Sequence, residues 1–139
     1  MTQSIQEVMA RDPICMSPSS NLVSAARVMR DAGIGDVILE EDGEVRGIVT
    51  DRDIVVRAVA EEASPLQVTL EEVCSRDLTA LSPSSSVEDA LMLMRDRALR
   101  RLPVLEDSHP VGIVSIGDLA RERDPSSALA SISKAPQNT

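Results

Sequence analysis

The sequence predicts an α/β (α+β) fold made of two tandem β-α-β-β-α repeats, and three observations support this prediction. The stretch GIVTDRD at residues 47–53 returns 65 positions later as GIVSIGD at residues 112–118. The match continues without a gap from RDPICMSPSS (residues 11–20), which aligns with RDLTALSPSS (residues 76–85), and about a third of the aligned positions are identical. Within each copy, extended and helical hydrophobic patterns follow one another in the same order.

The first two elements of each copy are a short strand and a helix. Strands are expected at residues 14–17 and 79–82, each ending at Ser-Pro, because proline disfavours a helical conformation in the preceding residue. A helix over residues 19–33 ends at Gly33 and presents one apolar face, made of Leu22, Ala25, Ala26 and Met29. In the second copy, Ser85 and Glu88 have capping-box spacing, and the face is made of Val87, Leu91 and Met94. We expect Met29, Leu91 and Met94 to lie in the core or in a dimer interface.

The last elements of each copy are a hairpin and a second helix. Residues 36–49 predict a hairpin that turns at Asp42-Gly43, and residues 99–114 predict a second hairpin with a less regular turn. Helices follow at residues 51–63 and 116–123. The acidic stretch at residues 40–44 is interpreted as a solvated hairpin tip rather than a metal site.

These elements divide the chain into four segments. We expect repeat 1 at residues 1–60, a linker leading into repeat 2 at residues 61–72, repeat 2 at residues 73–123 and a flexible tail at residues 124–139. A unit of about 55 residues buries little apolar surface alone. The two repeats are therefore expected to pack about a pseudo-twofold axis, with clefts lined by both.

Composition narrows the classes of function. A net charge of −9 argues against nucleic acid or an anionic membrane as the main partner, because both require a basic surface. The chain has no Phe, Tyr or Trp, so its core must be aliphatic. Cys15 and Cys74 are interpreted as buried reduced thiols, with an intramolecular disulfide as the alternative. With His109 as the single histidine, no zinc site is expected. No signal peptide or membrane span is recognised, which predicts a cytoplasmic protein.

The repeated corner at the end of each hairpin has two interpretations. Thr50 with Asp53, and Ser115 with Asp118, have the spacing of a capping box, which satisfies N–H groups at a helix start. The same groups suit a nucleotide, since a hydroxyl and helix N–H groups can bind phosphate and a carboxylate can accept both hydroxyls of a ribose. The two roles can coexist.

The paired corners, the SP-SS…A…M helices and RRLPVLED resemble a tandem of CBS domains, the repeats named after cystathionine beta-synthase. Two such repeats form a Bateman module. The resemblance covers roughly residues 5–123 and is similar in arrangement to free-standing two-repeat bacterial CBS proteins of the hypoxic response protein type. It implies a regulatory module that commonly pairs as a homodimer and often binds adenine nucleotides or related adenosyl ligands between its repeats. AMP, ADP, ATP and S-adenosylmethionine are the candidate ligands, and no required cofactor is implied.

The resemblance also implies unequal sites. In nucleotide-binding relatives such as the gamma subunit of AMP-activated protein kinase, a basic residue at the position of Arg101 reaches the phosphate of a nucleotide whose ribose is held by the preceding repeat's Asp. Carried over, this gives a site of Thr50, Asp53 and Arg101, with Thr79 and Arg52 as further candidates. The other site, with Ser115 and Asp118, would receive Asp36 and be weaker. A carboxylate about 4 Å from a phosphate costs roughly 4 kcal/mol at an effective dielectric of 20.

Three functions were weighed. The first is a ligand sensor that acts on a separate effector protein, because a regulatory module with no fused effector needs one. The second is a ligand-free dimeric interaction or scaffold module. An enzyme is not expected, because the sequence offers no nucleophile–base pair and no metal constellation.

Overall fold

The computed structural model describes residues 3–75 and 78–136, and it confirms a mixed α/β fold with two three-stranded sheets. The elements up to residue 75 are η1 (Ile5–Glu7), β1 (Ala10–Arg11), β2 (Cys15–Met16), α1 (Leu22–Ala32), β3 (Asp36–Glu41), β4 (Glu44–Thr50), α2 (Asp51–Ile54), the π-helix η2 (Val55–Val59) and α3 (Leu70–Val73). The later elements are α4 (Val87–Arg97), β5 (Arg101–Glu106), β6 (His109–Ser115), α5 (Ile116–Arg123) and α6 (Ala128–Lys134). Arg76 and Asp77, which open the second copy of the repeated motif, lie outside the described residues, as do residues 137–139.

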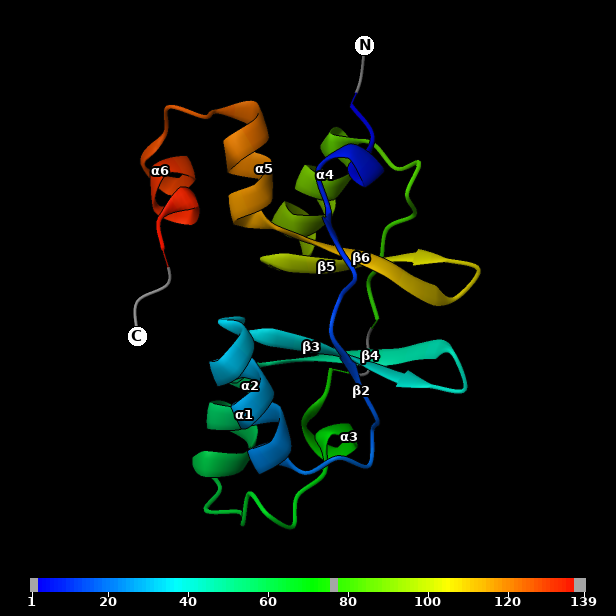
Figure 1. Ribbon diagram of the computed structural model, residues 1–139, viewed down its shortest axis with the longest axis vertical. Helices are drawn as coiled ribbons and strands as arrows, with labels where there is room; N and C mark the ends of the chain where they lie inside the picture. Colours follow the sequence, from blue (N-terminus) through cyan, green and yellow to red (C-terminus); the bar gives the residue numbers. More distant parts are fainter. Residues whose placement is uncertain (1–2, 76–77, 137–139) are drawn as a thin grey trace. The chain divides into compact units, whose positions relative to one another are not determined.

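The chain folds into two compact units. We call residues 13–78 with 108–110 the first-repeat unit, and the remaining residues the second-repeat unit. In the first-repeat unit, the sheet has the order β2-β3-β4, with β2 parallel and β4 antiparallel to β3. The hairpin turns at Asp42 and Gly43, whose φ angles of 55° and 79° confirm the predicted Asp-Gly turn. Helices α1 and α2 lie against the sheet (Figure 1), and the core includes Leu22, Val37 and Val49.

The second-repeat unit has a sheet of order β1-β6-β5, on which α4 and α5 pack (Figure 1). Its hairpin turn was expected to be less regular, and this prediction is wrong. Asp107 and Ser108 form the same two-residue turn with positive φ angles of 51° and 69°. The core includes Val87, Leu102 and Val114.

The segment that leads into each repeat belongs to the compact unit of the other repeat. Ile5 is fully buried in the core of the second-repeat unit, and Leu70, 65 positions later, is fully buried in the core of the first-repeat unit. The strand pairings follow the same exchange, since Ala10 pairs with Ile113 and Ser75 pairs with Ile48. Residues 61–72, expected to be a linker and the entry to repeat 2, include Leu70, whose side chain lies in the core of the first-repeat unit. The predicted division into domains stays a prediction.

The predicted helix of the first repeat is confirmed at both ends. Asn21 caps its start, where the side chain accepts a hydrogen bond from Ser24 N–H, and Gly33 ends it in the left-handed conformation. Ala26 is exposed rather than part of the buried face.

In the second repeat the predicted cap is shifted by one residue. The capping box is formed by Ser86 and Asp89, while Ser85 Oγ accepts a hydrogen bond from Ser82 N–H in the preceding turn. Leu91, expected on the buried face, is 39% exposed because Val87, Ala90 and Met94 define that face.

The segment after Arg123, expected to be flexible, contains helix α6. Ser127 caps this helix by accepting a hydrogen bond of 3.1 Å from Ala130 N–H. Ala130 is fully buried, and α6 packs beside α5 (Figure 1).

Candidate functional site

The first corner is the junction between β4 and α2, and it is a complete capping box. Thr50 N–H donates to Asp53 Oδ2 at 2.9 Å, and Asp53 N–H donates to Thr50 Oγ1 at 3.2 Å. Asp53 is 18% exposed, so one edge of its carboxylate remains accessible. The capping interpretation of Thr50 and Asp53 is confirmed.

The second corner, between β6 and α5, repeats this geometry. Ser115 N–H donates to Asp118 Oδ2 at 2.8 Å, and Asp118 N–H donates to Ser115 Oγ at 3.1 Å. The two repeats thus build the same strand-to-helix junction from the same residue types. In each carboxylate, Oδ2 accepts the hydrogen bond of the capping box, and Oδ1 is the atom that could accept a hydrogen bond from a ligand.

The Oδ1 atoms of Asp53 and Asp118, which we call the outer carboxylate oxygens, have different partners in the two corners. Asp53 Oδ1 lies 3.8 Å from Arg57 Nε, which is an ion-pair distance beyond hydrogen-bond reach. Arg57 Nη1 instead donates to the carbonyl oxygens of Val73 and Cys74 at 3.4 and 3.2 Å. Asp118 Oδ1 accepts a direct hydrogen bond from Arg121 Nη2. The outer oxygen of Asp53 is therefore less engaged than that of Asp118.

The other predicted site residues divide between the two units. Arg52 is exposed on the first turn of α2, and Asp36 pairs with Thr50 across the hairpin, so both lie at the first corner. Thr79 and Arg101 are half-buried in the second-repeat unit, which also contains Ser115 and Asp118. The joint site of Thr50, Asp53, Arg101 and Thr79 therefore draws on both units and stays a prediction.

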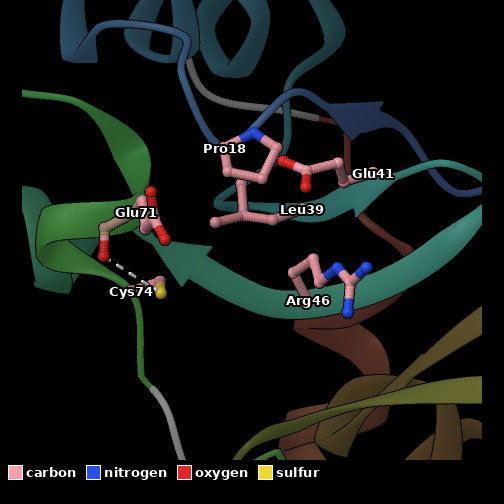
Figure 2. A pocket seen from close by; sticks show the side chains of 6 residues that line it. All are labelled: Pro18, Leu39, Glu41, Arg46, Glu71 and Cys74. Carbon is pink, nitrogen blue, oxygen red and sulfur yellow. Dashed lines mark hydrogen bonds between the residues drawn. The ribbon is translucent and has the colours of Figure 1, made fainter.

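A pocket that the sequence did not predict lies in the first-repeat unit, and none of its lining residues belongs to a corner. It has a volume of about 290 Å³ and is lined by Pro18, Leu39, Glu41, Arg46, Glu71 and Cys74. Figure 2 shows Arg46 and Glu41 on one side and Glu71 and Cys74 on the other, with the Cys74 thiol donating to the Glu71 carbonyl oxygen at 3.3 Å.

The alignment of the two repeats indicates where this pocket could have been predicted. The positions of Cys74 and Arg46 correspond to Met9 and Val111, which pack against the core of the second-repeat unit. A pocket is expected where a small or polar residue replaces a large apolar one at an equivalent position.

The described residues show neither a metal-binding cluster nor a membrane-spanning helix. Within residues 3–75 and 78–136, no three His, Cys, Asp or Glu side chains gather in a way that could hold a metal ion. None of the helices in these ranges has the length and apolar character needed to cross a bilayer.

Comparison with known proteins identifies the family. The family model described as "CBS domain" matches this chain twice, at residues 5–59 and 70–124. With its two matching repeats and its duplicated corner, the chain belongs to the CBS-domain family. It is a tandem CBS-domain module.

Two relatives and one solved structure are similar to this chain over most of its length. The CBS domain-containing protein YhcV of Bacillus subtilis is 35% identical over 134 residues, which cover 94% of this chain and 95% of YhcV. Hypoxic response protein 1 of Mycobacterium tuberculosis is 30% identical, with coverage of 94% and 91%. A crystal structure of Hypoxic Response Protein I with two coordinated zinc ions matches with a TM-score of 0.78 at 29% identity and covers 86% of this chain and 98% of that chain.

A more distant solved structure shares the fold. The CBS domain pair of protein MJ0100, in complex with 5′-methylthioadenosine and S-adenosyl-L-methionine, matches with a TM-score of 0.83 at 22% identity. The alignment covers 91% of this chain and all of that chain.

Proposed function

We propose that this protein is a regulatory module that binds an adenosyl ligand at its first corner, where Asp53 accepts hydrogen bonds from the ribose and Thr50 lies near the phosphate. The observation that supports the proposal is the difference between the partners of Asp53 Oδ1 and Asp118 Oδ1. Asp53 Oδ1 has an arginine only at ion-pair distance, whereas Asp118 Oδ1 is hydrogen-bonded by Arg121. A diol can bind to Asp53 without first displacing a charge-assisted hydrogen bond.

Family membership supports the choice of ligand class. The MJ0100 pair, which shares this fold, holds two adenosyl compounds. AMP, ADP, ATP and S-adenosylmethionine are therefore the compounds to test here. Ser115 and Asp118 are the weaker second site.

The proposal includes Arg101 and Thr79 at the phosphate end of the first site, with Arg52 as a helper. Arg101 begins β5, and the preceding carbonyl of Arg100 accepts a hydrogen bond of 2.9 Å from Ile116 N–H, at the start of α5. Two arrangements therefore compete, because Arg101 could serve either corner. Mutation distinguishes them. If Arg101 serves the first corner, Arg101→Ala should weaken the same site that Asp53→Asn weakens. If Arg101 serves the second corner, Arg101→Ala should weaken the site that Asp118→Asn weakens.

The central experiment is isothermal titration of the four compounds into the wild-type protein and into Asp53→Asn and Asp118→Asn. Asparagine keeps a side-chain oxygen for the cap and removes the charge, so the two variants form a matched pair. Hydrogen bonds to a charged group contribute about 1.5–3 kcal/mol, so Asp53→Asn should weaken binding by roughly tenfold or more. Undiminished binding in Asp53→Asn, or a larger loss in Asp118→Asn, would contradict the assignment.

A second candidate function is a ligand-free, homodimeric interaction module. Exposed apolar side chains favour it, since Val55, Val56 and Val59 of η2 are 56%, 45% and 59% exposed. Thermal denaturation separates the two candidates, because a ligand that binds only the folded state raises the melting temperature. Sedimentation velocity tests the homodimer directly.

In the regulatory role, the module is proposed to act on a separate effector protein rather than to catalyse a reaction. A ligand shifts a conformational equilibrium only through different affinities for its states. Affinity capture with and without the bound compound tests this step. Equal recovery of a specific partner under both conditions would argue against switching.

A further inference from the structure

Helix α6 is docked on the part of α5 that carries the second corner. Ala130, the third residue of α6, is fully buried, and α6 runs beside α5 (Figure 1). Both helices belong to the second-repeat unit, so this contact lies within one compact unit.

The contact includes Gly117, which lies between Ser115 and Asp118 in the sequence. A methyl group at Gly117 would lie 3.0 Å from Ser133 Cβ and 3.6 Å from Ser115 Oγ. Ser133 of α6 therefore fills the space over the first turn of α5, beside the hydroxyl that caps it. A side chain at this position would require the Ser133 side chain to shift.

Arg121 connects α6 to the carboxylate of the second corner. Its Nη2 donates to Asp118 Oδ1, and its Nη1 donates to the Ser133 carbonyl oxygen at 3.4 Å. When α6 is docked, the guanidinium has acceptors on both sides and is held against the outer oxygen of Asp118. The loss of α6 removes one of these two acceptors.

The first corner has different residues around its carboxylate, since Val56 stands at the position of Arg121 and Arg57 follows one residue later. Arg52 occupies the position of Gly117 and is exposed. Arg57 is hydrogen-bonded to the Val73 and Cys74 carbonyl oxygens and stays 3.8 Å from Asp53. The covering helix and the engaged carboxylate therefore occur together at the second corner.

We propose that α6 is an internal cover of the second corner. In this arrangement, Ser133 and Arg121 exclude an adenosyl ligand from Ser115 and Asp118 until α6 leaves α5. The inference rests on the proposed function, since it assigns to the second corner the same class of ligand as the first. Its consequence is that the second site binds with an affinity reduced by the fraction of molecules in which α6 is undocked.

The test uses two glutamate substitutions on α6 in the 139-residue chain. Ala130→Glu places a charge at a fully buried position and should release the helix. Ile132→Glu adds the same charge at a side chain that is 71% exposed and should leave the helix docked. A third variant that ends after Arg123 lacks α6 altogether. Hydrogen exchange of the α5 amides reports release independently of any ligand.

AMP and S-adenosylmethionine are then titrated separately into each protein. We expect one site per chain in the wild type and in Ile132→Glu, and two sites in Ala130→Glu and in the shortened chain. The affinity of the second site should rise by at least about tenfold on release. The added site should disappear when Asp118→Asn is combined with Ala130→Glu.

The outcomes separate the two proposals. One site in every variant, with α5 exchange showing release, overturns the cover and leaves the proposed function intact. No site in the wild type but one Asp118-dependent site after release supports the cover and overturns the first-corner assignment. No binding in any variant overturns both. If Ala130→Glu and the shortened chain are both unfolded by circular dichroism, α6 is a core element and the cover is overturned.

Discussion

Replacing Cys74 by methionine should stabilise the protein, because it fills the pocket of the first-repeat unit with the residue type found at the equivalent position of the second-repeat unit, Met9. The Cys74 thiol sits against Gly47, since a methyl group there would lie 3.4 Å from Sγ. In the second-repeat unit, Met9 sits against the equivalent Gly112, where a methyl group would lie 2.9 Å from Met9 Cγ. The methionine side chain is therefore already accommodated at the equivalent position of the second-repeat unit.

The magnitude follows from the groups added. Methionine adds two carbon atoms to cysteine, which stabilise by about 1.6 kcal/mol if buried, at roughly 0.8 kcal/mol each. Ordering the longer side chain offsets about 1 kcal/mol of this. We expect a net gain of about 0.5 kcal/mol for Cys74→Met. The reverse change, Met9→Cys, should cost roughly 1–2 kcal/mol because it also leaves a cavity.

Urea denaturation of the wild type and four variants measures these effects. Cys74→Ala is the matched control that removes the thiol without filling the pocket, so the order of stability at position 74 should be Met, then Cys, then Ala. The double variant Cys74→Met with Met9→Cys should show additive effects, because the two side chains pack in different units. The reasoning is refuted if Cys74→Met is less stable than Cys74→Ala, or if Met9→Cys has no effect.

Two further predictions concern titrating groups. Thr69 N–H and its hydroxyl donate to Glu72 Oε2 at 2.7 and 3.1 Å and hold the pKa of Glu72 below its usual range. Because the folded pKa lies below the unfolded value, this stabilisation is present above about pH 4.3 and is lost as the pH falls through the folded pKa. Glu72→Gln should therefore lower the melting temperature at pH 7, and this difference should shrink as the pH is lowered towards 3, whereas Glu71→Gln should have little effect at either pH. A Glu72→Gln difference that does not shrink as the pH falls would contradict this. Burial, together with the Glu40 carboxylate, raises the pKa of the Cys15 thiol, so Glu40→Gln should speed its alkylation by iodoacetamide at pH 8, measured on the Cys15 peptide by mass spectrometry, and an unchanged rate would contradict the stated cause.

Much of the local structure could be predicted from the sequence because it depends on short-range chemistry. The Asp42-Gly43 turn needs positive φ at both residues, and Gly33 ends a helix for the same reason. The two corners could be predicted as capping boxes because the hydroxyl and carboxylate are three residues apart. The cap of α4 was misplaced by one residue, since three consecutive serines offer the same chemistry and only packing of Val87 selects Ser86.

The duplication, the strand and helix order and the paired corners were determined by the sequence alone, because each depends on the spacing of neighbouring residues. The tertiary structure decided which segments share a core. Ile5 and Leu70 are buried in the unit of the opposite repeat, and Ala130 is buried against α5, although neither follows from local pattern. It also decided which arginine engages which carboxylate, since Arg57 and Arg121 are drawn to carbonyl oxygens of segments 12 to 17 residues away. Contacts between segments that are remote in sequence depend on how the helices pack. The spacing of residues along a single sequence therefore does not predict them.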